Sequence, residues 1–216
     1  MKVLELFKGS GSISKYFENI PNVDVISLDI LEKYSPTICC DIMDWNYKEY
    51  PVGYFTYIFA SPECKIFSSL QYTMIGRVGG RSKKLDPTKT IEKLNEKRKE
   101  NSKFILKTIE IIKYFQPTFY FIENPMYSTI WNYIPQEFNI GINVSYCKFG
   151  YKYKKNTRII TNKKILQDCL CRRKKGLFEC CGLPKHTATI GHIGTQKQDL
   201  LERYSIPENL LKYLFS

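Results

Sequence analysis

Short apolar runs, most of them followed by a chemically distinctive residue, recur along the chain and constrain its fold more than any other feature. Residues 3–7, 23–28, 37–42, 54–60 and 118–122 have the composition of buried strands. Helical patterns lie between several of them, over residues 13–19 and from about residue 91 to 112. Strands that alternate with helices predict an α/β fold with a mostly parallel sheet. Residues 143–149 and 157–161 lack an intervening helix, so we expect an antiparallel hairpin there.

Residues just beyond four of these runs are candidates for chemistry. Gly9 and Gly11 form a turn that opens a helix, Asp29 follows the second run, Cys64 follows the run over 54–60, and Glu123 follows the run over 118–122. The carboxyl ends of parallel strands share one edge, where ligands bind, so we expect these features to face one crevice. A glycine turn before a helix and an acid at the tip of the next strand are typical of nucleoside sites. Together they predict a thiol nucleophile beside a nucleoside cofactor.

Each of these residues also has a purely structural interpretation. A cysteine taken at random is more often a small apolar core side chain than a nucleophile. Asp29 could cap the helix that follows it, and Glu123 could cap a helix over 126–133. The shared position of all four features at strand ends favours the chemical interpretation. The chain has no P-loop lysine motif, which disfavours phosphoryl transfer.

The charge and the aromatic content favour a nucleic-acid partner. The net charge is +12 and aromatic residues make up 14% of the chain, so lysine and arginine can contact phosphates while rings stack on bases. A basic, glycine-containing segment spans residues 72–103 and follows Cys64 closely, as a loop that closes over a strand of nucleic acid would. On charge alone, a solvated lysine-rich surface is an equally good explanation.

The compartment can also be predicted. The chain lacks an apolar run of roughly 18 residues, and its amino terminus enters a strand-like run without a signal-peptide pattern. We therefore expect an intracellular, cytoplasmic protein in a reducing compartment. Its eight cysteines are then expected to be free thiols or metal ligands rather than disulfides.

A cysteine-rich segment near the carboxyl terminus has two interpretations. It contains enough ligand types for a tetrahedral zinc site, formed by four of Cys169, Cys171, Cys180, Cys181 and His186. The spacing is not that of a Cys-x-x-Cys pair, and reduced, partly buried thiols are the alternative. We expect a catalytic domain over residues 1–162, this small recognition module over 163–193, and a C-terminal helix over 194–216 that packs back on the catalytic domain.

At this point the chain resembles the DNA cytosine 5-methyltransferases, and most closely their short phage and virus-like members. The resemblance covers nearly the whole chain. Residues 6–11 (Leu-Phe-Lys-Gly-Ser-Gly) are similar to the cofactor motif, with Glu5 where aspartate is usual. Residues 64–68 are similar to the nucleophile motif, 123–124 to the glutamate motif, and 151–162 to the segment that supplies an arginine to the target base. Residues 194–196 and 203–207 resemble the end of such short enzymes.

The resemblance implies a Rossmann-like fold and the cofactor S-adenosylmethionine. Asp29 matches the acid that binds the ribose, and Asp41 with Ile42 matches the pair that holds the adenine. From the residues alone, Asp44 competes with Asp41 for that role. The full set of cofactor residues implied is Phe7, Gly9, Gly11, Asp29, Ile30, Asp41 and Ile42.

The resemblance also implies the reaction, which is methyl transfer to carbon 5 of a cytosine flipped out of double-stranded DNA. Cys64 would attack carbon 6, Glu123 would supply a proton to ring nitrogen 3, and Arg158 would contact the target base. We expect the nucleic acid to be bound by basic and polar residues from two segments: Lys65, Ser68, Arg77, Arg81, Lys83, Lys84, Lys154 and Lys155.

One departure keeps two alternatives open. The family's nucleophile directly follows proline, whereas Glu63 precedes Cys64 here. A neighbouring carboxylate disfavours the thiolate, so a catalytically weakened relative that binds DNA or cofactor is one alternative. The other is methylation of cytosine in RNA, which the sequence distinguishes poorly from methylation of DNA.

Overall fold

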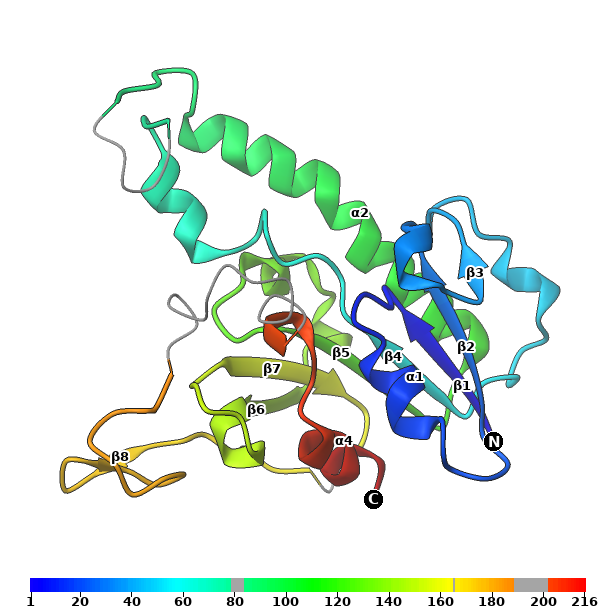
Figure 1. Cartoon of the computed structure of the whole chain (residues 1–216). Helices are drawn as coiled ribbons and strands as arrows, with labels where there is room; N and C mark the ends of the chain where they lie inside the picture. Colours follow the sequence, from blue (N-terminus) through cyan, green and yellow to red (C-terminus); the bar gives the residue numbers. More distant parts are fainter. Residues whose placement is uncertain (79–83, 165, 189–201) are drawn as a thin grey trace.

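A seven-stranded sheet forms the centre of the computed structural model, which describes residues 1–78, 84–164, 166–188 and 202–216 (Figure 1). The strand order is β3-β2-β1-β4-β5-β7-β6. The first five strands run parallel, and β7 is antiparallel to both β5 and β6. The mostly parallel sheet and the antiparallel hairpin that the sequence predicts are therefore confirmed. The strands are β1 (Lys2–Leu6), β2 (Asp24–Asp29), β3 (Ile38–Cys39), β4 (Tyr57–Ala60), β5 (Phe119–Pro125), β6 (Gly141–Ser145) and β7 (Asn156–Thr161).

Alternate residues of the central strands build two cores, one on each face of the sheet. In β4, Ile58 and Ala60 face the helix α2 (Ile91–Phe115), while Phe59 faces α1 (Ser12–Phe17) and α4 (Glu208–Phe215). This alternation follows from the strand period of two. Each large apolar side chain buried in this way contributes roughly 1.5–3 kcal/mol. Phe215, near the end of α4, packs its ring against Phe121 at 5.3 Å between centroids, which seats α4 on the sheet.

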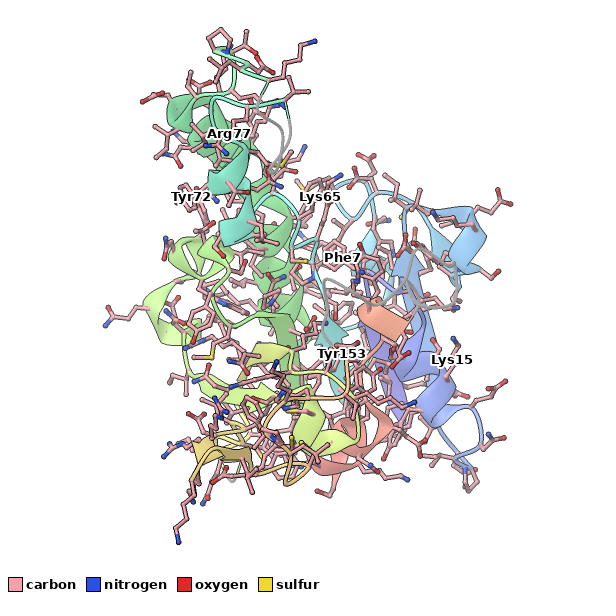
Figure 2. The ribbon with its side chains drawn as sticks, turned by 60° about the vertical axis from the view of Figure 1, so that its left-hand side comes forward. Phe7, Lys15, Lys65, Tyr72, Arg77 and Tyr153 are labelled. Atoms are coloured by element: carbon pink, nitrogen blue, oxygen red, sulfur yellow. The ribbon has the colours of Figure 1, made fainter. Side chains whose placement is uncertain are left out.

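Helix α2 is the longest element, and a residue with a defined capping role marks each of its ends. The Thr90 side chain accepts a hydrogen bond from the Lys93 amide, and Gln116 adopts a left-handed conformation just before Pro117. Its amino-terminal end and the segment before it extend beyond the sheet (Figure 1). That segment contains the 3₁₀ helix η3 (Ser69–Met74). Lys65, Tyr72 and Arg77 follow one another along this projecting arm (Figure 2).

Several expected elements differ in length or type. The expected strand over 54–60 begins only at Tyr57, and the expected helix over 13–19 ends at Phe17. Only Ile38–Cys39 of the expected strand over 37–42 pairs, because the Asp41 carboxylate accepts the Met43 amide and turns the chain. The expected helix over 126–133 is a short 3₁₀ helix, η4 (Thr129–Tyr133). The expected strand over 143–149 ends at Ser145 and continues as η6 (Tyr146–Phe149), because consecutive residues there are buried rather than alternate ones.

The remaining short elements lie at the surface and in the C-terminal module. They are η1 (Glu32–Tyr34), η2 (Tyr47–Glu49), η5 (Gln136–Phe138), β8 (Arg173–Lys174) and β9 (Leu177–Phe178). Among the described residues, the helices lack the combined length and apolarity that crossing a membrane requires.

Candidate active site

The turn after β1 is held by the acid at the tip of β2. Phe7, Gly9 and Gly11 all have positive φ angles, of 59°, 49° and 68°. The left-handed conformation is rare for a phenylalanine, and such strain collects at functional sites. The Gly9 amide donates to Asp29 Oδ2 at 2.9 Å, and the Leu31 amide donates to Asp29 Oδ1 at 2.9 Å. Each carboxylate oxygen therefore retains acceptor capacity for a further donor.

Glu5 stabilises the start of α1, the helix that follows this turn. Its carboxylate accepts hydrogen bonds from the backbone amides of Ile13 at 3.0 Å and Ser14 at 3.2 Å, so it caps the amino terminus of α1. Burial is the main cause that raises the pKa of Glu5. The glutamate thus has a structural role, fixing the helix that the glycine turn opens.

A pocket opens beside this turn at the carboxyl ends of the strands. Five of the seven predicted cofactor residues line it: Phe7, Asp29, Ile30, Asp41 and Ile42. Gly9 and Gly11 line a second hollow on the other side of the turn, and Asp44 lines neither. The side chain of Ile30 is 61% exposed at the pocket.

The pocket residues fit a nucleoside cofactor such as S-adenosylmethionine. Apolar side chains such as Ile30 and Ile42 offer flat contact to a purine, while Asp29 and Asp41 offer acceptors for ribose hydroxyls and an adenine amino group. The loop after β4 also forms part of the pocket wall, because its residues Pro62 and Glu63 line the pocket. The pocket is thus lined by residues on both sides of Cys64 in the sequence.

Glu123 lies near the carboxyl end of β5, next to β4, the strand that leads to Cys64. Glu123 is 7% exposed, and its Oε1 accepts a hydrogen bond from the Tyr146 hydroxyl at 3.0 Å. Lys155 Nζ lies 3.6 Å from the same oxygen and 4.5 Å from the centroid of the Tyr146 ring. Burial is the main cause that raises the pKa of Cys64, the Glu123 carboxylate raises it further, and Lys155 lowers it. The charges of Glu123 and Lys155 therefore act in opposite directions on the pKa of the Cys64 thiol.

The loop after β4, which carries Cys64, is held in place by the strand that carries Glu123. The Asn124 side chain donates to the Pro62 carbonyl at 2.8 Å, which ties the end of β5 to the loop after β4. Glu63 is exposed, and it raises the pKa of Cys64 less than burial and Glu123 do. Its carboxylate is thus a small influence on the thiol.

Comparison with known proteins identifies the family. No protein-family model matches the chain. The "Probable DNA (cytosine-5)-methyltransferase" of Frog virus 3 (isolate Goorha) is 30% identical over 165 residues, which cover 75% of this chain and 71% of that protein. The chain belongs to the DNA (cytosine-5)-methyltransferase family.

Solved methyltransferase structures are more distant. The S. pombe Dnmt2 methyltransferase has 16% identity and a TM-score of 0.49, with 74% of this chain and 48% of that chain covered. The Entamoeba histolytica methyltransferase EhMeth has 15% identity and a TM-score of 0.48, with 74% and 52% covered. The chain spans about half the length of these structures. The family assignment rests on the viral relative.

Arg158 of this methyltransferase lies on the opposite face of the sheet from the Glu123 carboxyl group. In the β5–β7 register Ile159 is opposite Glu123 and Arg158 is opposite Asn124, so Arg158 faces the other side of the sheet. Its guanidinium donates to the Asn139 carbonyl at 3.1 Å and the Asn139 side chain at 3.0 Å. Lys155, rather than Arg158, is the cation that the structure brings to Glu123.

The expected nucleic-acid residues divide into two groups. Lys65 and Arg77 are exposed on the projecting arm. In the same arm, Ser68 caps the amino terminus of η3, and the Lys84 carbonyl accepts a hydrogen bond from the Val78 amide. Lys154 and Lys155 turn inward, since Lys154 Nζ donates to the Cys171 carbonyl at 2.9 Å. Arg81 and Lys83 lie outside the described residues.

A residue that the sequence analysis missed holds the loop that follows Cys64. Arg98 of α2 is 2% exposed, and its guanidinium donates to the carbonyls of Ile66 at 3.1 Å and Ser68 at 3.4 Å. It also donates to the Tyr72 hydroxyl at 2.8 Å and lies over the Tyr72 ring. Its charge in a lysine-rich segment suggests a solvated helix face, so the sequence carries no signal for this role.

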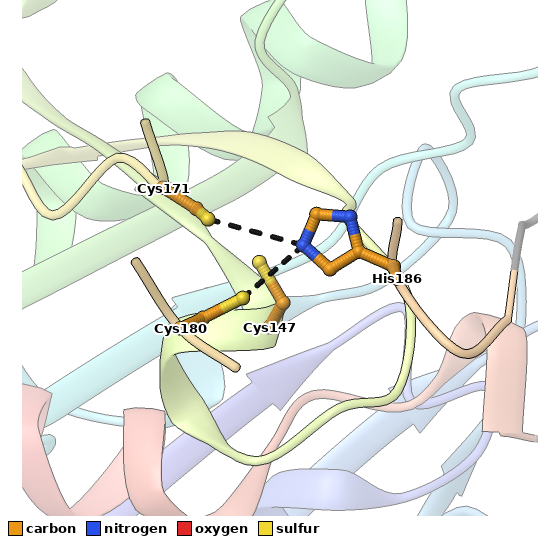
Figure 3. A group of neighbouring side chains, drawn as sticks. All are labelled: Cys147, Cys171, Cys180 and His186. Carbon is orange, nitrogen blue, oxygen red and sulfur yellow. Dashed lines mark hydrogen bonds between the residues drawn. The ribbon is translucent and has the colours of Figure 1, made fainter. Parts of the chain in front are cut away.

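The cysteine cluster differs in membership from the expected one. Cys171, Cys180 and His186 come together as predicted, and the fourth member is Cys147 from η6 (Figure 3). Cys169 and Cys181 lie outside the cluster. The backbone of Cys169 pairs with that of Asn143 and Ser145 beside β6, and Cys181 is exposed. Cys147 was missed because it belongs to another segment of the sequence.

Proposed function

We propose that this chain methylates carbon 5 of cytosine in DNA, with Cys64 as the nucleophile. The observation that carries the proposal is that Asn124 ties the loop of Cys64 to the end of β5, where Glu123 is buried beside Lys155, next to a pocket that fits a nucleoside. A nucleophile, a proton-carrying group and a cation are the groups that addition to a cytosine ring requires.

The Cys64 thiolate adds to carbon 6 of the flipped base, and Glu123 delivers a proton to ring nitrogen 3. Addition converts the carbon 5–carbon 6 double bond to a single bond and leaves an enamine between carbon 4 and carbon 5, so carbon 5 can attack an electrophilic carbon. S-adenosylmethionine, when bound, would supply that methyl group, with its sulfur–methyl bond breaking and S-adenosylhomocysteine leaving as the thioether. Loss of the carbon 5 proton to a base then expels the Cys64 thiolate and restores the ring. Nitrogen 3 returns its proton to Glu123.

Phe7, Asp29, Ile30, Asp41 and Ile42 hold the cofactor in this proposal, with Gly9 and Gly11 shaping the turn. A raised Cys64 pKa leaves the thiol mostly protonated at neutral pH.

Contacts to DNA are proposed for the basic residues of the projecting arm, Lys65, Arg77, Arg81, Lys83 and Lys84, together with Ser68. Of the two inward-turned lysines, Lys155 acts through Glu123, while the Lys154 ammonium is held at the Cys171 carbonyl. Arg158 is proposed to contact the target base, which requires its guanidinium to exchange Asn139 for the base.

The deciding experiment compares wild type, Cys64→Ala and Cys181→Ala, which removes an exposed cysteine outside the site. Each is incubated with S-adenosylmethionine and either duplex DNA or RNA, followed by base-resolution detection of 5-methylcytosine. Methylated DNA from wild type and Cys181→Ala, with loss of at least about 10³-fold in Cys64→Ala, supports the proposal. Methylation of RNA alone reassigns the substrate. Undiminished transfer by Cys64→Ala overturns the nucleophile.

A further inference from the structure

The four ligand atoms of the cysteine cluster have the spacing of a tetrahedral metal site. The sulfur atoms of Cys147, Cys171 and Cys180 and a ring nitrogen of His186 all lie within 4.8 Å of one another (Figure 3). His186 Nε2 is 3.1 Å from Cys180 Sγ and 3.8 Å from Cys171 Sγ. A tetrahedral zinc ion with bonds of about 2.3 Å to sulfur and 2.0 Å to nitrogen separates its ligands by roughly 3.5–3.8 Å. The separations of the four side-chain atoms, from 3.1 Å to at most 4.8 Å, span these values.

We propose that Cys147, Cys171, Cys180 and His186 bind one zinc ion. Three thiolates and one imidazole form a closed set without an open position, which is the pattern of structural rather than catalytic zinc. Cys147 and Cys171 are 7% and 2% exposed, so the metal is shielded on the side that faces the catalytic domain.

The segment that supplies two of these ligands lacks a core of its own. From residue 172 to 188, a range that the structure describes completely, no side chain is buried. Its β8 and β9 strands have two residues each, and the ring of Phe178 packs on His186 at 4.1 Å between centroids. A segment with so little apolar burial requires another source of stability, and metal binding is a common one.

Hydrogen bonds to the backbone of Cys171 hold this ligand in place. Its amide donates to Ser145 Oγ at 3.0 Å, and its carbonyl accepts from Lys154 Nζ at 2.9 Å. Supporting contacts of this kind orient ligands at metal sites. The Lys154 ammonium also brings positive charge to a site that carries net negative charge when three thiolates bind Zn²⁺.

The zinc ion joins the C-terminal module to the element beside the active site. Cys147 directly follows Tyr146 in η6, and Tyr146 donates to Glu123. Zinc at Cys147 therefore fixes the short helix that positions the hydroxyl donor of the proposed acid. The zinc site itself does not depend on the proposed methylation, and its test uses no activity measurement.

Metal content of the full chain, purified without chelator and then incubated with ZnCl₂ and desalted, tests the site. We expect about one zinc per chain in wild type and a loss of roughly tenfold or more in Cys171→Ser and His186→Ala. Cys169→Ser and Cys181→Ser are matched controls and should keep full occupancy. Wild type that retains less than about a tenth of an equivalent overturns the site, as does full occupancy in Cys171→Ser or loss of zinc in the controls.

A second measurement on wild type guards against variants that fail to fold. Replacement of zinc by Co²⁺ should produce the visible absorption of tetrahedral, thiolate-bound cobalt, saturating at about one equivalent, with the same spectrum in Cys169→Ser. An absent or octahedral cobalt spectrum overturns the proposal. A disulfide between two of the cluster cysteines, found by peptide mapping of the freshly purified protein, also overturns it.

Discussion

The Tyr146 hydroxyl donates a hydrogen bond to the Glu123 carboxylate across 3.0 Å at the base of the candidate active site. Burial raises the pKa of Tyr146 well above that of an exposed tyrosine, and the Glu123 carboxylate adds to this effect. The phenol is therefore protonated at neutral pH and acts as a hydrogen-bond donor to Glu123.

Tyr146→Phe tests this relationship. Loss of a hydrogen bond to a charged group costs about 1.5–3 kcal/mol, so we expect kcat for methyl transfer to fall roughly 10- to 100-fold. DNA affinity should change little, because the phenol is buried. Tyr127→Phe, at a 69% exposed tyrosine near the end of β5, is the matched control and should retain wild-type kcat. An unchanged kcat in Tyr146→Phe argues against Tyr146 as the residue that positions Glu123.

Lys155→Met should raise the pKa of Cys64, the proposed nucleophile. Lys155 lowers the pKa of Cys64, so its removal should raise that pKa and shift thiolate formation to higher pH. Alkylation of Cys64 by iodoacetamide, followed by peptide mass spectrometry from pH 6 to 10, measures this shift. Lys152→Met, in the same turn and exposed, should leave the alkylation profile unchanged. A profile that is unchanged or shifted to lower pH in Lys155→Met contradicts the assigned role of Lys155.

Sequence reasoning predicted the features at strand ends because each belongs to a local pattern. An apolar run followed by Asp29 or Cys64 can be recognised within a few residues, and parallel strands bring such ends to one edge. The partners of Glu123 could not be found in this way. Tyr146 and Lys155 reach it only through the register of an antiparallel pairing and the turn to η6 after β6.

The same limit explains the other missed residues. Cys147 joins the cysteine cluster from a distant segment, so spacing within residues 169–186 could not reveal it. Arg98 lies among charged residues on a helix, and only the loop that covers it makes it buried. Roles that depend on one segment covering another are not encoded in local composition.

Glu5→Gln should destabilise the fold through the cap of α1. The amide group of glutamine cannot accept the hydrogen bonds that both carboxylate oxygens receive, so at least one donor of Ile13 or Ser14 loses its partner. We expect the free energy of unfolding to fall by about 1–3 kcal/mol, measured by urea denaturation. Glu18→Gln, exposed at the end of the same helix, should stay within about 0.5 kcal/mol of wild type. Equal stability of Glu5→Gln and wild type would show that Glu5 does not act as the cap.

Arg98→Lys should make the loop that follows Cys64 more mobile. The arginine donates to the carbonyls of Ile66 and Ser68 and to the Tyr72 hydroxyl, and a lysine ammonium cannot reproduce this planar arrangement. We expect kcat to fall on the order of 10- to 100-fold, because small displacements of a reacting group have effects of that size.

The effect on catalysis has to be separated from unfolding. Turnover of Arg98→Lys is therefore measured at a temperature where circular dichroism shows the variant to be folded, alongside Lys97→Met as an exposed control on the same helix. Limited proteolysis should cleave the loop over residues 64–74 faster in Arg98→Lys than in the control, because the buried donors that hold it are missing. If kcat falls while the loop stays protected, Arg98 does not act by positioning the loop. Wild-type kcat in a folded Arg98→Lys would remove the role altogether.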